Sequence, residues 1–227
     1  MSLHTRDLEA YYSRRALEYD RIYQKPERQA DLQTLRQYVA THMRDRHVLE
    51  VACGTGYWTS VLAPIAAAVL AVDVADATLD VARHRMAWPP AVRFARADAY
   101  ALSEARAVSV AAPFTAALAG FWISHVPRHR LTAFLAQLNR TLSSNATVVL
   151  FDNRFVAGSS TDISTVASTG DTYQLRRLDD GSAFEVLKNF YQPDELLHAV
   201  VSAGDVGVHS TRVDLLPYYW VLRYVIG

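Results

Sequence analysis

Apolar and polar positions alternate along the middle of the chain in a pattern that predicts strands and helices by turns. Short apolar runs, typical of buried strands, are each followed by a segment whose apolar residues recur every three or four positions, typical of a helix. The expected strands are 47–52, 68–75, 91–98, 113–122 and 145–153, and the expected helices between them are 57–66, 76–86, 99–106 and 128–142. This succession predicts a wound α/β sheet with parallel strands.

The two ends of the chain follow other patterns. Amphipathic helices are expected at 6–20 and 27–43, with Pro26 between them. After the fifth strand, the pattern predicts a polar loop (157–170), a hairpin around an Asp-Asp-Gly turn (172–191), a helix (192–204) and closing strands (206–215 and 218–226). Because no linker separates these parts, we expect one domain over residues 1–227.

Charge and cysteine content narrow the class of protein. Lys plus Arg and Asp plus Glu number 23 each, so no basic excess favours a nucleic-acid partner. The apolar runs are too short for a membrane span, and the charged first residues do not fit a secretory signal. The single cysteine, Cys53, excludes a disulfide within the chain and a cysteine-cluster metal site. We expect a cytoplasmic protein with no nucleic-acid or membrane partner, while the oligomeric state stays open.

Gly54 and Gly56 lie at the junction between the first strand and its helix. Backbone amides at such a junction bind anions and nucleotides. The dinucleotide fingerprint requires a third glycine where this chain has Thr59, and no Gly-Lys-Ser/Thr phosphate loop follows. The turn therefore predicts a nucleotide-like ligand, and a nicotinamide cofactor is disfavoured.

The residues around this turn resemble a known family. Glu50-x-x-x-Gly54-x-Gly56 resembles the first motif of class I S-adenosylmethionine-dependent methyltransferases, and Asp73 and Asp98 end the next two strands. The resemblance covers about residues 45–153 together with the closing strands. It implies an α/β, Rossmann-like wound sheet of seven strands, mostly parallel with an antiparallel last strand, and an N-terminal helical lid. It also implies S-adenosylmethionine as the cofactor, with Asp73 on its ribose and Asp98 on its adenine amine.

The resemblance also assigns the parts of the chain and its site residues. Residues 1–44 would form the lid, 45–153 the cofactor-binding core, 154–192 a roof over the substrate and 193–227 the closing helix and strands. The residues expected to bind the cofactor are Tyr11, Tyr19, Glu50, Ala52, Gly54, Thr55, Gly56, Trp58, Asp73, Val74, Asp98, Ala99 and Gly120. Those expected to bind the substrate are Tyr12, Phe121 and Trp122, and His125 is the candidate catalytic base. Arg15 is a further candidate, as a partner of the methionine carboxylate.

Each of these residues also has a purely structural interpretation. The glycines could serve only the turn, and the two aspartates could cap helices. The aromatic side chains could belong to the core, and Cys53 is expected to be a small buried residue. His125 could fix a loop, which is the more frequent use of a histidine in such a place. One departure from the family pattern is Thr115, where an acidic residue usually follows the aromatic residue of the fourth strand.

The motifs that are missing narrow the methyl acceptor. The chain has no cysteine after a proline for attack on cytosine carbon, and it reads Gly120-Phe121-Trp122-Ile123 where enzymes acting on base amines carry Asp/Asn-Pro-Pro-Tyr/Phe. Only Asp152 and Asn153 suggest a magnesium site, so no metal is expected. We expect methyl transfer to a small organic acceptor, with oxygen (hydroxyl or carboxylate) favoured. The alternatives are N-methylation of a small amine, a non-catalytic cofactor-binding partner and, least favoured, a nicotinamide-dependent reductase.

Overall fold

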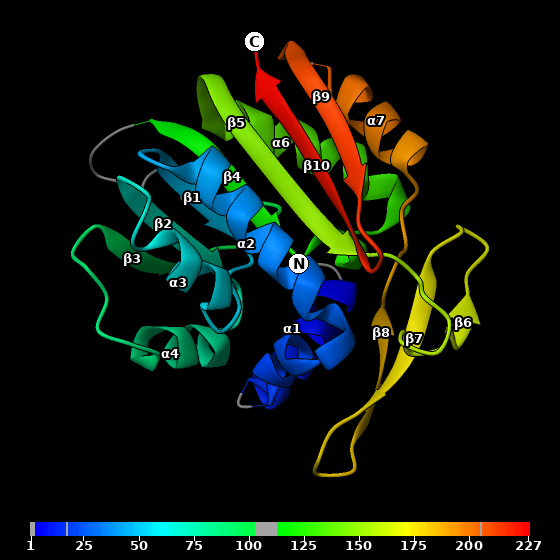
Figure 1. Ribbon diagram of the computed structural model, residues 1–227. Coiled ribbons are helices and arrows are strands. Elements are labelled where there is room, and N and C mark those ends of the chain that lie inside the picture. The colour runs from blue at the N-terminus through cyan, green and yellow to red at the C-terminus, as the bar shows by residue number, and fades with distance from the viewer. Residues whose placement is uncertain (1–2, 17, 103–112, 205) are drawn as a thin grey trace.

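The computed structural model describes residues 3–16, 18–102, 113–204 and 206–227. Its centre is a seven-stranded sheet in the order β3-β2-β1-β4-β5-β10-β9 (Figure 1). Strands β1 to β5 run parallel, and β10 is antiparallel to both β5 and β9. The strands are β1 (His47–Val51), β2 (Ala68–Asp73), β3 (Val92–Arg96), β4 (Phe114–Gly120), β5 (Leu142–Asn153), β9 (Val208–Leu215) and β10 (Tyr219–Ile226). The expected fold class is confirmed, with the last strand inserted between β5 and β9.

Helices cover both faces of this sheet (Figure 1). Successive residues of a buried strand point to opposite faces, and Val48 and Leu49 accordingly belong to two different core clusters. One cluster packs against α2 (Gln29–Met43), α3 (Tyr57–Leu62) and α4 (Asp76–His84), and the other against α6 (Leu131–Thr141) and α7 (Pro193–Ser202). Both faces are therefore apolar, which explains why the strands read as nearly continuous apolar runs. No helix in the described ranges has the length and apolar character required to cross a membrane.

The N-terminal segment differs from the prediction. The expected helix over 6–20 is wrong in its extent: α1 covers Leu3–Arg15, and a 3₁₀ turn follows at Tyr19–Gln24. The aromatic rings of this turn pack beside the glycine turn and the start of α3. Tyr23 stacks on Tyr57 with ring centroids 3.6 Å apart. A second 3₁₀ turn, Pro26–Arg28, leads into α2. Half of the expected helix over 99–106, residues 103–106, lies outside the described ranges.

A second, three-stranded sheet forms from the segment after β5 and stands apart from the main sheet (Figure 1). The expected hairpin is present as β7 (Thr172–Arg177) and β8 (Ala183–Leu187). The loop expected over 157–170 also contributes a short strand, β6 (Thr165–Val166), which pairs with β7. A strand of two residues carries no periodicity, so the sequence alone gave no sign of it. Helix α1 packs between this sheet and α4, at the carboxyl ends of the parallel strands.

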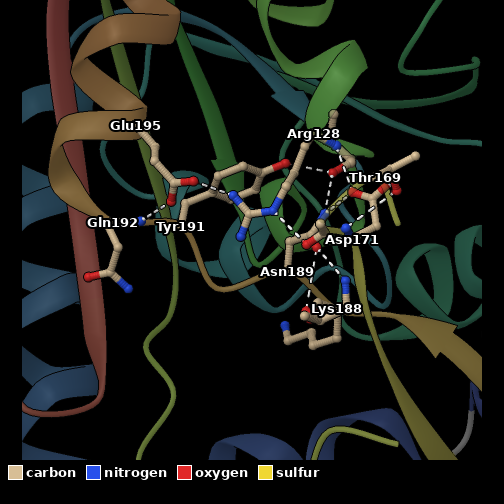
Figure 2. A network of polar contacts seen from close by, with 11 residues as sticks. Arg128, Thr169, Asp171, Lys188, Asn189, Tyr191, Gln192 and Glu195 are labelled. Carbon is tan, nitrogen blue, oxygen red and sulfur yellow. Dashed lines mark hydrogen bonds and ion pairs between the residues drawn. The ribbon is translucent and has the colours of Figure 1, made fainter. Parts of the chain in front are cut away.

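A buried polar network anchors the second sheet to the core (Figure 2). Asp171, which is 4% exposed, accepts hydrogen bonds from the backbone N–H of Arg128 (2.8 Å) and from Nδ2 of Asn189 (2.9 Å). Asn189 Nδ2 also donates to the Val126 carbonyl oxygen (3.0 Å). The Arg128 guanidinium pairs with Glu195 at the start of α7. The network therefore fixes the strands after β5 to the connection that follows β4.

We expect Asp171→Ala to lower the free energy of unfolding by about 2–4 kcal/mol, because it leaves the backbone N–H of Arg128 and one N–H of the buried Asn189 amide without an acceptor. Urea denaturation measures the difference. Asp162→Ala is the control, since Asp162 is exposed and makes no hydrogen bond or ion pair in the described part of the chain. Equal stability of the two variants would contradict the anchoring role.

Candidate functional site

An open pocket of about 890 Å³ lies at the carboxyl ends of β1, β2, β3 and β4. The ends of parallel strands beside a change in strand order are the usual ligand site of such sheets. Many of the residues singled out from the sequence line this pocket: Tyr12, Tyr19, Ala52, Gly54, Asp73, Val74, Asp98, Ala99, Gly120, Phe121, Trp122 and His125. Residues that sequence analysis missed include Leu8, Glu9, Thr78, Tyr100, Pro127 and Arg130.

Glycine is required at the two positions of the turn for different structural reasons. Gly54 (φ +55°) lines the pocket, and its N–H donates to Asp73 Oδ2 at 2.9 Å. Gly56 (φ +79°) faces away from it, and a Cβ there would lie 3.1 Å from the Cβ of Ala82 in α4. Positive φ values favour glycine at both positions. Gly54 thus leaves space for a ligand, and Gly56 lets a helix approach the turn.

Asp73 and Asp98 present carboxylates to the pocket. Asp73 also accepts from the backbone N–H of Ala75 (3.0 Å), and burial raises the pKa of its carboxyl above the ordinary value. Asp98 Oδ1 accepts from the N–H of Tyr100 (2.9 Å), while its other oxygen has no hydrogen bond within the described residues. Carboxylates on two neighbouring strand ends match the hydroxyls of a ribose and the amine of an adenine. The residues present therefore fit a bound adenosyl group.

Six of the candidate residues do not line this pocket: Tyr11, Arg15, Glu50, Thr55, Gly56 and Trp58. Arg15 lines a second pocket instead. Thr55 donates to Asp20 Oδ1 (2.6 Å) in the 3₁₀ turn after α1, and that aspartate also pairs with Arg85 of the segment after α4 at 2.5 Å. Trp58 packs edge-on against Phe151 in the core. Contact of these residues with the cofactor stays a prediction.

Glu50 lies behind the glycine turn and is 2% exposed. Its Oε2 accepts a hydrogen bond from Thr59 Oγ1 at 2.6 Å. Burial, together with the nearby Asp73 carboxylate, raises the pKa of Glu50 to about 8. Glu50 is therefore protonated at neutral pH in the folded protein, and Thr59 occupies the position where a dinucleotide fingerprint would have glycine.

Two residues that line the pocket have positive φ values without being glycine. They are Ala52 (φ +53°), directly after β1, and Phe121 (φ +61°), directly after β4. Such a conformation costs of order 1–3 kcal/mol and concentrates at functional sites. The strain is local to the two strand ends that meet at the pocket, and no sequence pattern indicates it.

Four side chains separate this pocket from a second one of about 690 Å³. Tyr12, Tyr19, Phe121 and His125 line both. His125 is 5% exposed, and its Nδ1 lies 2.7 Å from the Leu187 carbonyl oxygen, so Nδ1 carries the proton and donates. Nε2 then accepts a hydrogen bond from the Tyr12 hydroxyl oxygen, which lies 2.7 Å away. Burial, and then the neighbouring Lys188 ammonium, lower the pKa of His125 to about 3.

The second pocket lies between α1, the 3₁₀ turns and the second sheet, and its other lining residues include Tyr11, Arg15, Lys25, Arg28, Arg176 and Lys188. Lys188 donates to Ser124 Oγ (2.6 Å) and to Asp152 Oδ1 (3.1 Å). Burial opposes ionisation of Asp152, but the Lys188 charge keeps the pKa of its carboxyl below the ordinary value. Apart from Tyr11 and Arg15, sequence analysis did not single out these residues, because they lie far apart along the chain and form no local motif.

A family model and several solved structures are similar to this chain. Residues 48–145 match a family described as "Methyltransferase domain". No curated protein matches the sequence significantly. The chain is similar to the structure of a complex of DhpI with SAH (27% identity, 99% of this chain and 97% of that one, TM-score 0.74) and to a DhpI-SAM-HEP complex (25%, 99% and 99%, 0.75). It shares its fold with SAM-bound CalS10, an amino pentose methyltransferase from Micromonospora echinaspora (18%, 92% and 96%, 0.63).

Three observations indicate the same class of protein: the domain match, the order of the strands in the sheet and the carboxylates at the strand ends. Residues 48–145 form a methyltransferase domain, and the comparisons support a class I S-adenosylmethionine-dependent methyltransferase. The protein is an enzyme that transfers the methyl group of S-adenosylmethionine, as the sequence predicted.

We expect Glu50→Gln to raise the free energy of unfolding at pH 8 by more than about 1 kcal/mol, since each unit of pKa difference is worth about 1.4 kcal/mol. In the unfolded chain the pKa of Glu50 is near the ordinary glutamate value of 4.5, whereas in the folded protein its pKa is about 8. Stability of the wild type therefore falls as the pH rises between these values, and glutamine removes this loss. Urea denaturation at pH 4 and pH 8 measures the effect, and a gain that is equal at both pH values would contradict the raised pKa.

We expect Asp73→Asn and Asp98→Asn each to weaken binding of S-adenosylhomocysteine by roughly 10–100-fold, the loss of a charge-assisted hydrogen bond. Asp98→Asn keeps the bond to Tyr100, so only its ligand affinity should change. Calorimetry measures binding. Asp76→Asn is the control, because Asp76 starts α4 three residues after Asp73 and does not line the pocket. An unchanged affinity would remove that carboxylate from the cofactor site.

Proposed function

We propose that the protein transfers the methyl group of S-adenosylmethionine to an oxygen atom of a small organic acceptor. The observation that carries the proposal is the wall of Tyr12, Tyr19, Phe121 and His125 that the two pockets share. One pocket has carboxylates suited to an adenosyl group, and the other is a concave space lined by aromatic and polar side chains, as small-ligand sites are. A methyl group held at the shared wall lies within reach of an acceptor in the second pocket.

The charge of the second pocket favours oxygen over nitrogen. Its lining includes Arg15, Arg28 and Arg176, and the described residues place no carboxylate in that lining. An amine acceptor is protonated near neutral pH, and it would be repelled by these cations and lack a lone pair for attack. This argument disfavours the N-methyltransferase alternative.

The catalytic requirement for such a transfer is alignment. Holding the acceptor oxygen in line with the methyl–sulfur bond and excluding water can supply roughly 7–11 kcal/mol of the barrier reduction. The aromatic side chains of α1 and of the 3₁₀ turn after it, Tyr12 and Tyr19, close this space from above the strand ends. We assign them to positioning and to water exclusion.

Incubation with isotopically labelled S-adenosylmethionine and a panel of small acids, alcohols and amines tests the proposal. We expect O-methyl products, identified by carbon nuclear magnetic resonance of the transferred methyl group. Transfer only to amines would overturn the oxygen assignment. Failure to form S-adenosylhomocysteine with any acceptor, in a protein that binds it, would favour the non-catalytic alternative.

We further propose that His125 positions Tyr12 rather than acting as a general base, because a base with a pKa of about 3 is too weak to remove a hydroxyl proton. We expect His125→Ala to raise KM and to change kcat less than tenfold, and kcat of the wild type to show no ionisation between pH 5.5 and 8. Steady-state kinetics across pH measure both. A fall of about 10²–10⁴-fold in kcat at constant KM would instead identify a general base.

A further inference from the structure

Five basic side chains line the second pocket: Arg15, Lys25, Arg28, Arg176 and Lys188. They come from two distant stretches of the sequence, 15–28 and 176–188: the end of α1 and the 3₁₀ region that follows it, and β7 and the residue after β8. The first pocket has the opposite character, with Glu9, Asp73 and Asp98 against Arg130. The two sides of the shared wall therefore differ in the sign of their charge.

Most of these cations have no anionic partner among the described residues. Lys188 pairs with Asp152, but the other four bind neutral oxygen atoms. Arg15 donates to the Tyr11 hydroxyl (2.8 Å), Arg28 to Asn153 Oδ1 (2.8 Å) and Arg176 to Gln174 Oε1 (2.5 Å). Lys25 donates to the carbonyl oxygen of Ser159 (2.9 Å). The lining of the pocket thus holds about four positive charges that no carboxylate contacts directly, and the exposed Glu27, outside the lining, acts on Lys25 and Arg28 only through space.

Two arginines of the N-terminal segments that face outward, Arg14 and Arg21, are paired. Arg14 lies 3.0 Å from Asp180, and Arg21 lies 2.7 Å from Asp179, both acids of the β7–β8 turn. Acidic residues are therefore within reach of this part of the chain, yet the inward side has none. The contrast indicates that the negative charge for the pocket is supplied by a ligand.

The cations also act on one another. Arg176 contributes to lowering the pKa of Lys25 and of Lys188, although burial is the larger cause in both. Burial lowers the pKa of Arg176 itself. Gathering like charges in a partly buried pocket costs stability, and a bound anion offsets that cost.

The pocket also lacks a base for a neutral acceptor. The groups that face His125 are Tyr12, Lys188, Asp152 and Arg176, and none of them restores a pKa near neutrality. Burial raises the pKa of Tyr12 and Tyr19 well above the ordinary value. A hydroxyl acceptor needs its proton removed as the methyl group arrives, whereas an oxyanion needs no base.

We propose that the acceptor is a small acid with at least two negative charges, held by Arg15, Arg28 and Arg176, and that one of its oxyanions receives the methyl group. This inference rests on the proposed O-methyl transfer and names its substrate class. A lone pair of the oxyanion forms the new C–O bond while the methyl C–S bond breaks and leaves its electron pair on sulfur. The positive charge of the sulfonium and one negative charge of the acid disappear together, and no proton moves.

The first test measures binding alone. Succinate, inorganic phosphate and the neutral analogue succinamide are titrated by calorimetry into protein saturated with S-adenosylhomocysteine. We expect at least one of the two anions to bind, succinamide not to bind, and Arg176→Gln to raise the dissociation constant at least tenfold, the usual effect of losing a charged hydrogen bond. Arg177→Gln is the matched control, because Arg177 is the next residue of β7, is exposed and does not line the pocket.

Three outcomes would overturn the inference: no binding of either anion at millimolar concentration, equal binding of succinamide, or equal dissociation constants for wild type and Arg176→Gln. Arg28 is less suited to this test because it also links α2 to residues after β5, and its loss could unfold the site. Arg15→Gln is the second variant, with Arg14→Gln as its control on the same helix. We expect the same tenfold difference between these two variants.

The second test uses labelled methyl groups and separates the inference from the proposed function. Acids should be methylated and their amides should not. Alkaline release of methanol identifies a carboxylate ester, and an alkali-resistant product from a phosphate monoester identifies a phosphate oxygen as the acceptor. Transfer to neutral alcohols alone would overturn the acid inference and leave O-methyl transfer intact. Transfer to amines alone would overturn both.

Discussion

The site depends on the hydrogen bond from the Gly54 N–H to the buried carboxylate of Asp73. It joins the turn after β1 to the end of β2, and the same carboxylate holds the N–H of Ala75 just before α4. One side chain therefore sets the spacing of two strand ends and the start of a helix. Because its oxygen atoms also face the pocket, the group that builds the turn is the group expected to bind the ribose.

A second constraint follows from the reaction. A positively charged methyl donor and its acceptor must come into contact while each binds only in its own pocket. Here carboxylates line the pocket that fits the cofactor, cations line the pocket proposed for the acceptor, and uncharged side chains, including Tyr12 and Phe121, stand between them. In the proposed function, each pocket favours its own ligand by charge.

The acceptor side is built by the parts of the chain outside the wound core. Helix α1 and the second sheet contribute Arg15 and Arg176, and the Asp171 network fixes that sheet to the connection after β4. The outward pairs between Arg14 and Asp180 and between Arg21 and Asp179 connect the same two parts at the surface. Exposed pairs contribute little stability, so the position of α1 depends mainly on its aromatic contacts, such as Tyr11 against Phe184.

The sequence by itself determined the wound sheet, the cofactor class and the glycine turn, because each rests on a local pattern. Apolar runs of strand length, two glycines after a strand, and acids at the next two strand ends are all readable over a few residues. The sequence pattern did not predict the short strand β6 or the end of α1 at Arg15, because these features depend on tertiary contacts and not on periodicity. Only the tertiary structure decided the pocket proposed for the acceptor. Its cations come from two stretches, 15–28 and 176–188, that are separated by well over half of the chain, and only folding brings them together in a lining that contains no carboxylate.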